Sequence, residues 1–174
     1  MIDFRESEEK KLSDQFFKKG YLILKSNNTY SLNYLRDKII TSIEKICDYK
    51  LQRNQSKDKF LNDFHKNIKQ NKLNDLRLKI IDLINKDKKF RLNYFLAAKD
   101  ILYKLVGNEL SMQTRINLSI QTPKDSSSLL PLHSDIWSGD SPFEVVIWIP
   151  LVDVYKTKSM FILPPKEYKK IEKN

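Results

Sequence analysis

The spacing of the apolar residues changes at Gly107, and this change constrains the fold more than any other feature of the 174-residue sequence. Before Gly107, apolar side chains recur every three or four residues, which is the period of a helix with one buried face. After Gly107, the stretch MQTRINLSIQ alternates strictly between apolar and polar residues, which is the period of a strand with one buried face. We therefore expect a mainly helical region over residues 1–107 and β-structure over residues 108–174.

Five helices are expected in the first region. The first covers residues 6–19 and is stopped by Gly20, and a short strand follows it near residues 21–25. Ser31 is expected to cap the second helix, and the fifth runs from Phe90 to Val106. The apolar positions that mark the second, third and fourth helices are Leu32, Leu35, Ile39, Ile43, Ile46, Phe60, Leu61, Phe64, Ile68, Leu73, Leu76, Ile80, Ile81 and Ile84.

The second region is expected to form antiparallel strands joined by turns. Strands are predicted in the alternating stretch, in the residues that lead into His133, over residues 143–151, and in the sequence SMFILP. The sequences TPKDSSS and SGDSP are predicted to be a loop and a turn between them. Helices followed by strands indicate an α+β fold, in which helices support the opening strands of a jelly roll.

Composition limits the classes of protein that this chain can belong to. There is no run of eighteen apolar residues, so no membrane span is expected, and the N-terminus lacks the pattern of a signal peptide. The single cysteine, Cys47, cannot form an internal disulfide, so a cytoplasmic protein is expected. The net charge of +10 comes mainly from lysines that stand beside acidic residues. A solvated helical surface explains them better than a nucleic-acid interface, because aromatic residues that could stack on bases do not alternate with them.

The sequence His133-Ser134-Asp135 is the strongest candidate for a functional site. Residues i and i+2 of a strand project from the same face, so an imidazole and a carboxylate can reach one ion. These are two of the three ligands of a 2-His-1-carboxylate iron(II) site. The alternative is structural: a histidine hydrogen-bonded to the backbone, and an aspartate that accepts hydrogen bonds in a turn before Gly139.

The surrounding residues resemble a known family. The stretch LPLHSDIWSGDSPFEVVIWIPLVD and the following KTKSMFILP are similar to the iron(II)- and 2-oxoglutarate-dependent dioxygenases, in the branch that includes phytanoyl-CoA dioxygenase. They are more similar still to dioxygenase-like proteins of bacterial surface-carbohydrate gene clusters. Residues 112–164 carry the resemblance, and QFFKKGYLILK is a looser match.

The resemblance implies a fold, two cofactors and a reaction. The fold would be a double-stranded β-helix, or jelly roll, with residues 108–174 as its first half and residues 1–107 as a helical support in one continuous domain. Iron(II) and 2-oxoglutarate would be the cofactors, with His133 and Asp135 as metal-binding and catalytic residues. The reaction would oxidise a C–H bond of a small carbohydrate, such as a sugar or nucleotide-sugar intermediate of surface polysaccharide synthesis.

Five further residues are candidates for binding the co-substrate or the substrate. Trp148 would line the 2-oxoglutarate pocket, or else belong to the core. Arg115 and Gln121 would donate hydrogen bonds to the 2-oxoglutarate carboxylates if their face turns inward, and would be solvated if it turns outward. Trp137 would stack on a substrate ring or pack within its loop, and Lys158 would meet an anionic substrate or remain an exposed lysine.

One departure from the family limits what the resemblance implies. The family's third iron ligand is a later histidine, followed by a basic residue that binds 2-oxoglutarate, but no histidine follows His133 in this sequence. The chain ends 39 residues after Asp135. We expect a fragment of a longer protein, a shortened and inactive paralogue, or a site completed by His65 or by a second subunit.

A truncated jelly roll would expose strand edges, which favours self-association. Two other classes of function remain open: a non-catalytic jelly-roll binding or interaction module, and a basic nucleic-acid-binding protein.

Overall fold

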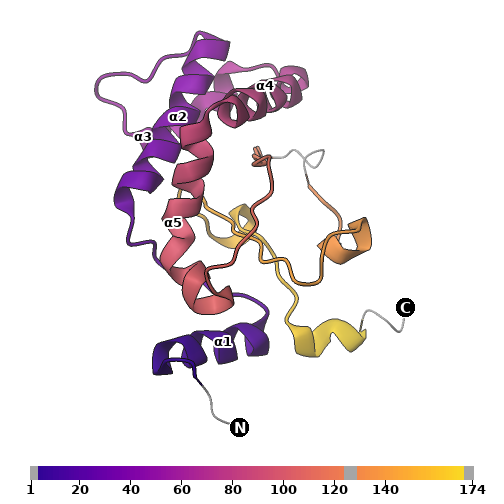
Figure 1. Cartoon of the computed structure of the whole chain (residues 1–174). Helices are drawn as coiled ribbons and strands as arrows, with labels where there is room; N and C mark the ends of the chain where they lie inside the picture. Colours follow the sequence, from indigo (N-terminus) through magenta and orange to yellow (C-terminus); the bar gives the residue numbers. More distant parts are fainter. Residues whose placement is uncertain (1–3, 124–128, 171–174) are drawn as a thin grey trace.

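The structure, a computed structural model, describes residues 4–123 and 129–170. Its α-helices are α1 (Ser7–Lys19), α2 (Thr29–Cys47), α3 (Lys57–Asp63), α4 (Leu73–Lys86) and α5 (Lys88–Val106), and they form the body of the molecule (Figure 1). Short 3₁₀ helices are η1 (Phe64–Asn67), η2 (Gln70–Lys72), η3 (Asp135–Ser138), η4 (Lys156–Lys158) and η5 (Pro165–Lys170). Four of the five helices predicted from the apolar spacing are therefore confirmed. The third is confirmed only in part, because α3 ends at Asp63, Phe64 lies in η1 and Ile68 is extended.

Local sequence explains where these helices begin and end. The Asn28 side chain caps α2 by accepting a hydrogen bond from the Ser31 backbone N–H at 2.9 Å, so the prediction that Ser31 is the cap is wrong. Gly20 ends α1 with a φ of 78°, in the left-handed region that glycine tolerates best. A Cβ at Gly20 would lie only 3.0 Å from Cδ of Pro165, because η5 packs against this end of α1.

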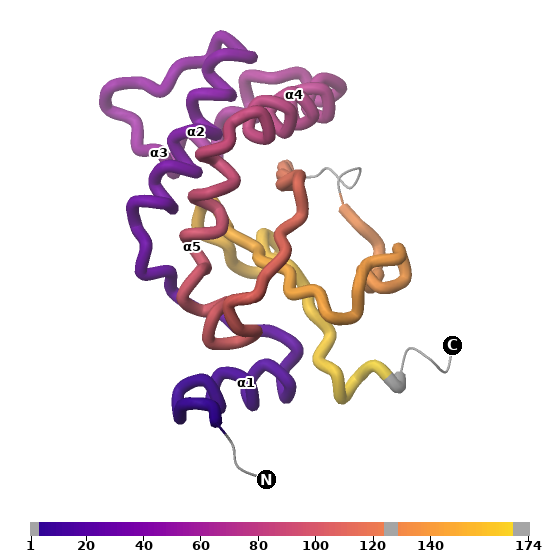
Figure 2. Tube along the Cα trace, viewed as in Figure 1, coloured from indigo at the N-terminus to yellow at the C-terminus, as the bar shows by residue number. Residues whose placement is uncertain are grey.

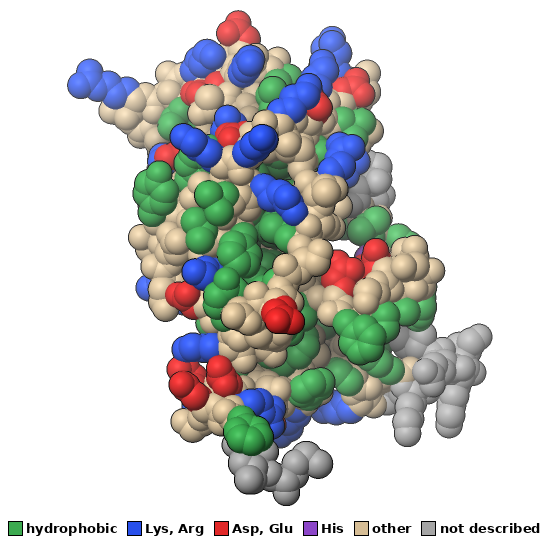
Figure 3. All heavy atoms as spheres, viewed as in Figure 1, with side chains coloured by type: hydrophobic (Ala, Val, Ile, Leu, Met, Phe, Trp, Pro, Cys, Tyr) green, Lys and Arg blue, Asp and Glu red, His purple; other side chains and the backbone are tan. Residues whose placement is uncertain are grey.

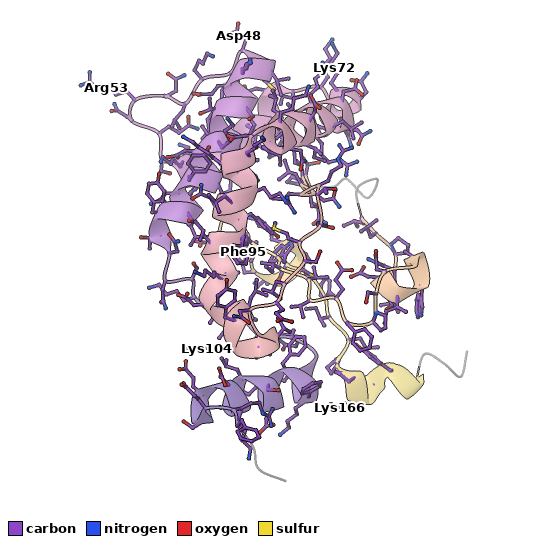
Figure 4. All side chains as sticks on the ribbon, viewed as in Figure 1. Asp48, Arg53, Lys72, Phe95, Lys104 and Lys166 are labelled. Carbon is purple, nitrogen blue, oxygen red and sulfur yellow. The ribbon has the colours of Figure 1, made fainter. Side chains whose placement is uncertain are left out.

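The core lies where α2 packs against α4 and α5, with α3 beside them. Leu35, Ile43, Phe60, Ile80 and Ile84 are almost completely buried there. Burial of each such side chain contributes about 1.5 to 3 kcal/mol. At the other end of the molecule, Lys104 of α5 donates a hydrogen bond to Glu8 of α1 at 2.7 Å, which joins these two helices (Figure 4).

The predicted strands are not present, and the predicted α+β fold with a jelly roll is wrong. Residues 4–123 and 129–170 contain no β-strand, so no sheet or barrel forms in this part of the chain. The sequences YLILK, MQTRINLSIQ, FEVVIWIPL and SMFILP and the residues before His133 are extended or irregular instead. Two of these segments, near residues 111–121 and 143–151, run beside the helical body (Figure 2).

The two long extended segments keep the alternation of strands without pairing as strands. Ile116, Leu118 and Ile120 from the first, and Ile149 and Leu151 from the second, pack against the core of the helices. The polar residues between the first three are exposed. In the first segment the apolar face is therefore the buried one, and helices, rather than a second sheet, cover it.

Side chains of the helices supply the hydrogen bonds that a neighbouring strand would otherwise supply. The Asn85 side chain of α4 donates to the Ile116 carbonyl at 2.9 Å and accepts from the Ile116 N–H at 2.8 Å. Arg91 of α5 donates to the carbonyls of Met112 and Gln113. The Tyr94 hydroxyl of α5 donates to the Ile147 carbonyl.

The remaining predictions concern a membrane span, a loop and the two ends of the chain. No helix within the described residues is long and apolar enough to span a membrane. Residues 124–128 of the predicted loop TPKDSSS lie outside the described residues. The first three residues of the N-terminus and the last four residues of the charged C-terminal tail lie outside them too.

Candidate metal site

His133 and Asp135 lie on an exposed turn that follows Pro131. Ser134 between them is extended, with a φ of −123° and a ψ of 138°, and η3 begins at Asp135. Two hydrogen bonds close this turn: the Trp137 N–H donates to the Ser134 carbonyl at 2.9 Å, and the Asp140 N–H donates to the Asp135 carbonyl at 3.2 Å. An extended residue places its two neighbours on the same side of the backbone, so both side chains project together even without a strand.

The distance between the two functional groups suits a shared metal ion. Nε2 of His133 lies 3.7 Å from Oδ1 of Asp135. Zn²⁺ makes bonds of about 2.0 to 2.2 Å to imidazole and carboxylate donors, so a single ion of similar size can reach both atoms. A neutral imidazole and a carboxylate are also two of the donors that non-haem iron(II) sites use.

A backbone carbonyl orients the imidazole. Nδ1 of His133 lies 2.8 Å from the carbonyl oxygen of Pro131. A carbonyl oxygen can only accept a hydrogen bond, so the neutral ring carries its proton on Nδ1. Nε2 then holds the free lone pair, on the side of the ring that faces Asp135. The same carbonyl–histidine arrangement orients metal-binding histidines in other proteins.

The described residues offer two metal donors at this turn, and a third is not among them. In residues 4–123 and 129–170 no group of three or more His, Cys, Asp or Glu side chains is placed to hold a metal ion. The side chains of His133 and Asp135 are 45% and 51% exposed, so the turn opens directly to solvent. Two protein donors with open positions beside them are therefore what this part of the chain offers.

The other predicted site residues make no contact with His133 or Asp135 through a hydrogen bond or an ion pair within the described residues. Arg115 and Gln121 are exposed, and Trp148 is exposed with Val146 on the outer face of its segment. Lys158 donates to the Asn62 side chain at 2.7 Å and lies over the Tyr155 ring. No hydrogen bond or ion pair among the described residues joins these side chains, or Trp137, to His133 or Asp135. Their binding roles stay predictions.

Two features of the site were not predicted from the sequence. The first is which carbonyl His133 contacts: the structural alternative expected a histidine hydrogen-bonded to the backbone, and the structure shows such a bond, to Pro131. The second is the apolar surroundings, because Leu130, Leu132, Ile136 and Trp137 are all exposed beside the pair in the sequence. His65, the other histidine, lies in η1 with its ring edge-on to Phe64.

Comparison of the chain with protein-family models, with curated proteins and with solved structures finds no match to any of them.

Proposed function

We propose that this chain binds iron(II) through Nε2 of His133 and a carboxylate oxygen of Asp135, as part of a non-haem iron(II)/2-oxoglutarate oxygenase. The observation that carries the proposal is the 3.7 Å approach of these atoms, with Nδ1 of His133 turned to the Pro131 carbonyl. The reaction type, and a sugar or nucleotide-sugar intermediate of surface polysaccharide synthesis as substrate, rest on the resemblance of residues 112–164 to that family.

Each residue of the turn has a separate role in this proposal. The Pro131 carbonyl holds the proton of His133 on Nδ1, and Asp135 supplies the negative charge that a divalent cation favours. Gly139 ends the turn with a φ of 96°. When bound, iron(II) and 2-oxoglutarate would allow dioxygen to act as the oxidant, with one oxygen atom going to the substrate C–H bond and the other to succinate as 2-oxoglutarate loses carbon dioxide.

Other residues would bind the organic molecules. The exposed ring of Trp137, two residues after Asp135, is available to stack on a sugar ring. The planar guanidinium of Arg115 suits a carboxylate of 2-oxoglutarate, with Gln121 and Trp148 as further candidates. With two protein donors, we expect weaker metal binding than in a site with three, unless a donor from outside the described residues joins them.

An anaerobic titration tests the metal site. Iron(II) added with 2-oxoglutarate is expected to give a weak visible charge-transfer band, which His133→Ala and Asp135→Ala abolish. The matched control is His65→Ala, because the chain has only two histidines and this variant removes the other one. It is expected to keep the band. Both ligands are exposed, so the variants are expected to keep the helical circular dichroism spectrum of the wild type.

Two results would contradict the proposal. One is a lack of metal uptake by the wild-type chain. The other is a band that survives in His133→Ala, since the ion would then bind elsewhere.

A second candidate function is a non-catalytic interaction module, favoured by the many apolar side chains that residues 129–162 expose. It predicts association with a partner and no charge-transfer band.

A further inference from the structure

The part of the chain that follows the helices exposes many large apolar side chains. Six of them define the apolar C-terminal surface: Leu130, Trp137, Phe143, Val146, Trp148 and Phe161, which are 45% to 92% exposed. Single exposed apolar residues are ordinary, but a dense set within some thirty residues is typical of a surface that another molecule covers.

The total exposed area is larger than a folded monomer of this mass requires. The chain exposes 13,778 Å², whereas a folded monomer of 20.7 kDa exposes about 8,900 Å². An unfolded chain exposes about 170 Å² per residue, so the 12 undescribed residues explain at most about 2,100 Å² of the excess. The remaining excess, about 2,800 Å², belongs to the whole chain, which also exposes Phe17, Ile23 and Leu92 outside this surface. It is larger than the roughly 800 Å² that each partner buries in a standard interface.

The segment of residues 143–151 shows why this surface is incomplete. Ile149 and Leu151 on its inner face pack against the helical core, while Val146 and Trp148 on its outer face are exposed. A segment that is apolar on both faces is typical of a strand that is covered on both sides. Apart from the Tyr94 hydroxyl on the Ile147 carbonyl, no described residue makes a hydrogen bond to the backbone of residues 145–151. This backbone is therefore free to pair with another extended chain.

The charge near this surface disfavours an anionic partner. Residues 129–154 contain Asp135, Asp140, Glu144 and Asp153 but no Lys or Arg, whereas Lys156 and Lys158 stand before Phe161. Lys and Arg side chains gather instead over the helices at the opposite end of the molecule (Figure 3). Nucleic acid and anionic membrane surfaces would be repelled by the acidic groups at the apolar surface.

We propose that the apolar C-terminal surface is covered by a second copy of this chain in a two-fold dimer. A second copy presents the same apolar surface and the same unpaired extended backbone, so a symmetric contact buries both at once. Each copy carries a net charge of +10 and the same acidic groups near the contact, and both oppose association. The dimer is therefore expected to become stronger as salt is added, because salt screens this repulsion.

Sedimentation equilibrium of the whole chain tests the dimer. The wild type is expected to move with concentration from 20.7 kDa to twice that mass, with a dissociation constant that falls as salt is raised. Trp148→Glu is expected to weaken the dimer at least tenfold, because a charge would be buried where an aromatic ring contributes to the contact. The matched control is Leu78→Glu on α4, because Leu78 is 51% exposed and Trp148 is 45% exposed. It is expected to leave the dissociation constant unchanged.

Hydrogen exchange of the wild type tests the same contact without a substitution. The backbone amides of residues 145–149 are expected to exchange more slowly at concentrations where the dimer forms. A mass of one chain at every concentration would overturn the proposal. A mass that keeps rising with concentration beyond that of a dimer would overturn it too, because the chain would then aggregate. Equal weakening by the Leu78 variant would place the contact elsewhere, and a monomer that binds neutral phosphatidylcholine vesicles would identify a lipid surface as the occupant.

Discussion

At the scale of single residues, the chemistry of His133 depends on the backbone before it. The Pro131 carbonyl accepts a hydrogen bond from Nδ1, and this leaves Nε2 as the donor atom that faces Asp135. The contact uses the backbone of Pro131 and not its ring. A substitution at residue 131 would therefore affect His133 only by changing the direction of this carbonyl. The contact that orients the imidazole is thus a local one, between residues two apart in the sequence.

A second residue with a defined electrostatic role is Asp87, which lies between α4 and α5. Hydrogen bonding from Lys38, at 2.8 Å, is the main cause of the lowered pKa of Asp87. The Tyr34 hydroxyl and the Lys89 backbone N–H also donate to this carboxylate, at 2.9 Å each. Burial and the same contact with Asp87 raise the pKa of Tyr34 to about 12.

The lowered pKa makes the stability of the helical body depend on pH. A carboxyl group with a lower pKa in the folded state stabilises the protein above its ordinary pKa of about 4, and this contribution is lost as the pH falls further. Asp87→Asn is expected to reduce the free energy of unfolding by about 1 kcal/mol at pH 7. The difference from the wild type is expected to shrink in acid. Urea denaturation across this pH range checks both points.

Asp82→Asn is the control for Asp87, because Asp82 pairs with Lys86 on the exposed surface of α4. It is expected to change the stability by less, since exposed ion pairs contribute little. An equal loss in both variants, or a constant loss for Asp87→Asn at every pH, would contradict the role given to Asp87.

At the scale of elements, Asn85 holds the first extended segment to α4. Asn85→Ala removes both hydrogen bonds to Ile116 and leaves the N–H and the carbonyl of a buried residue without these partners. We expect the free energy of unfolding to fall by about 1 to 3 kcal/mol. The Ile116 amide is also expected to exchange its hydrogen faster, which mass spectrometry of peptides from residues 112–120 can measure.

Asn74→Ala is the matched control on the same helix, because the Asn74 side chain contacts only Arg77 at the surface. It is expected to leave both measurements close to those of the wild type. Unchanged exchange at Ile116 in the Asn85 variant would show that apolar packing alone holds the segment.

The elements also show how far the sequence determines this structure. The helices were predictable because apolar residues four positions apart, such as Leu76, Ile80 and Ile84, indicate both a helix and the face of it that is buried. The absence of strands was not predictable. Alternation at Ile116, Leu118 and Ile120 indicates only which side chains share a face, and says nothing about what the backbone pairs with. Whether the backbone pairs with a strand or with the side chain of Asn85 depends on residues far away in the sequence.

The candidate site too was predictable in one respect and not in others. That His133 and Asp135 approach each other was predictable, since residues two apart share a side wherever the residue between them is extended. A backbone hydrogen bond of His133 was expected only under the structural alternative, and the sequence did not identify Pro131 as its partner. The exposure of the pair was not predictable, because it depends on how the turn at η3 lies against the rest of the molecule.

At the scale of the whole molecule, a well-packed helical body carries a C-terminal part that exposes many apolar side chains. The surface lysines of the helices are partly neutralised in ion pairs, such as Lys38 with Asp87 and Lys86 with Asp82. The candidate metal site and the apolar C-terminal surface both belong to the exposed part. Metal binding and dimer formation nevertheless have separate readouts, because the first is followed by spectroscopy of His133 and the second by the mass of the complex.

Nitrogen-15 NMR of the two histidine rings tests the metal site most directly. Before metal is added, the hydrogen bond to the Pro131 carbonyl predicts a proton on Nδ1 of His133. Addition of Zn²⁺, a diamagnetic ion that accepts the same donors, is expected to shift the Nε2 resonance of His133 and leave His65 unchanged. A shift of His65 instead, or no shift of either ring at saturating Zn²⁺, would contradict a metal site at His133 and Asp135.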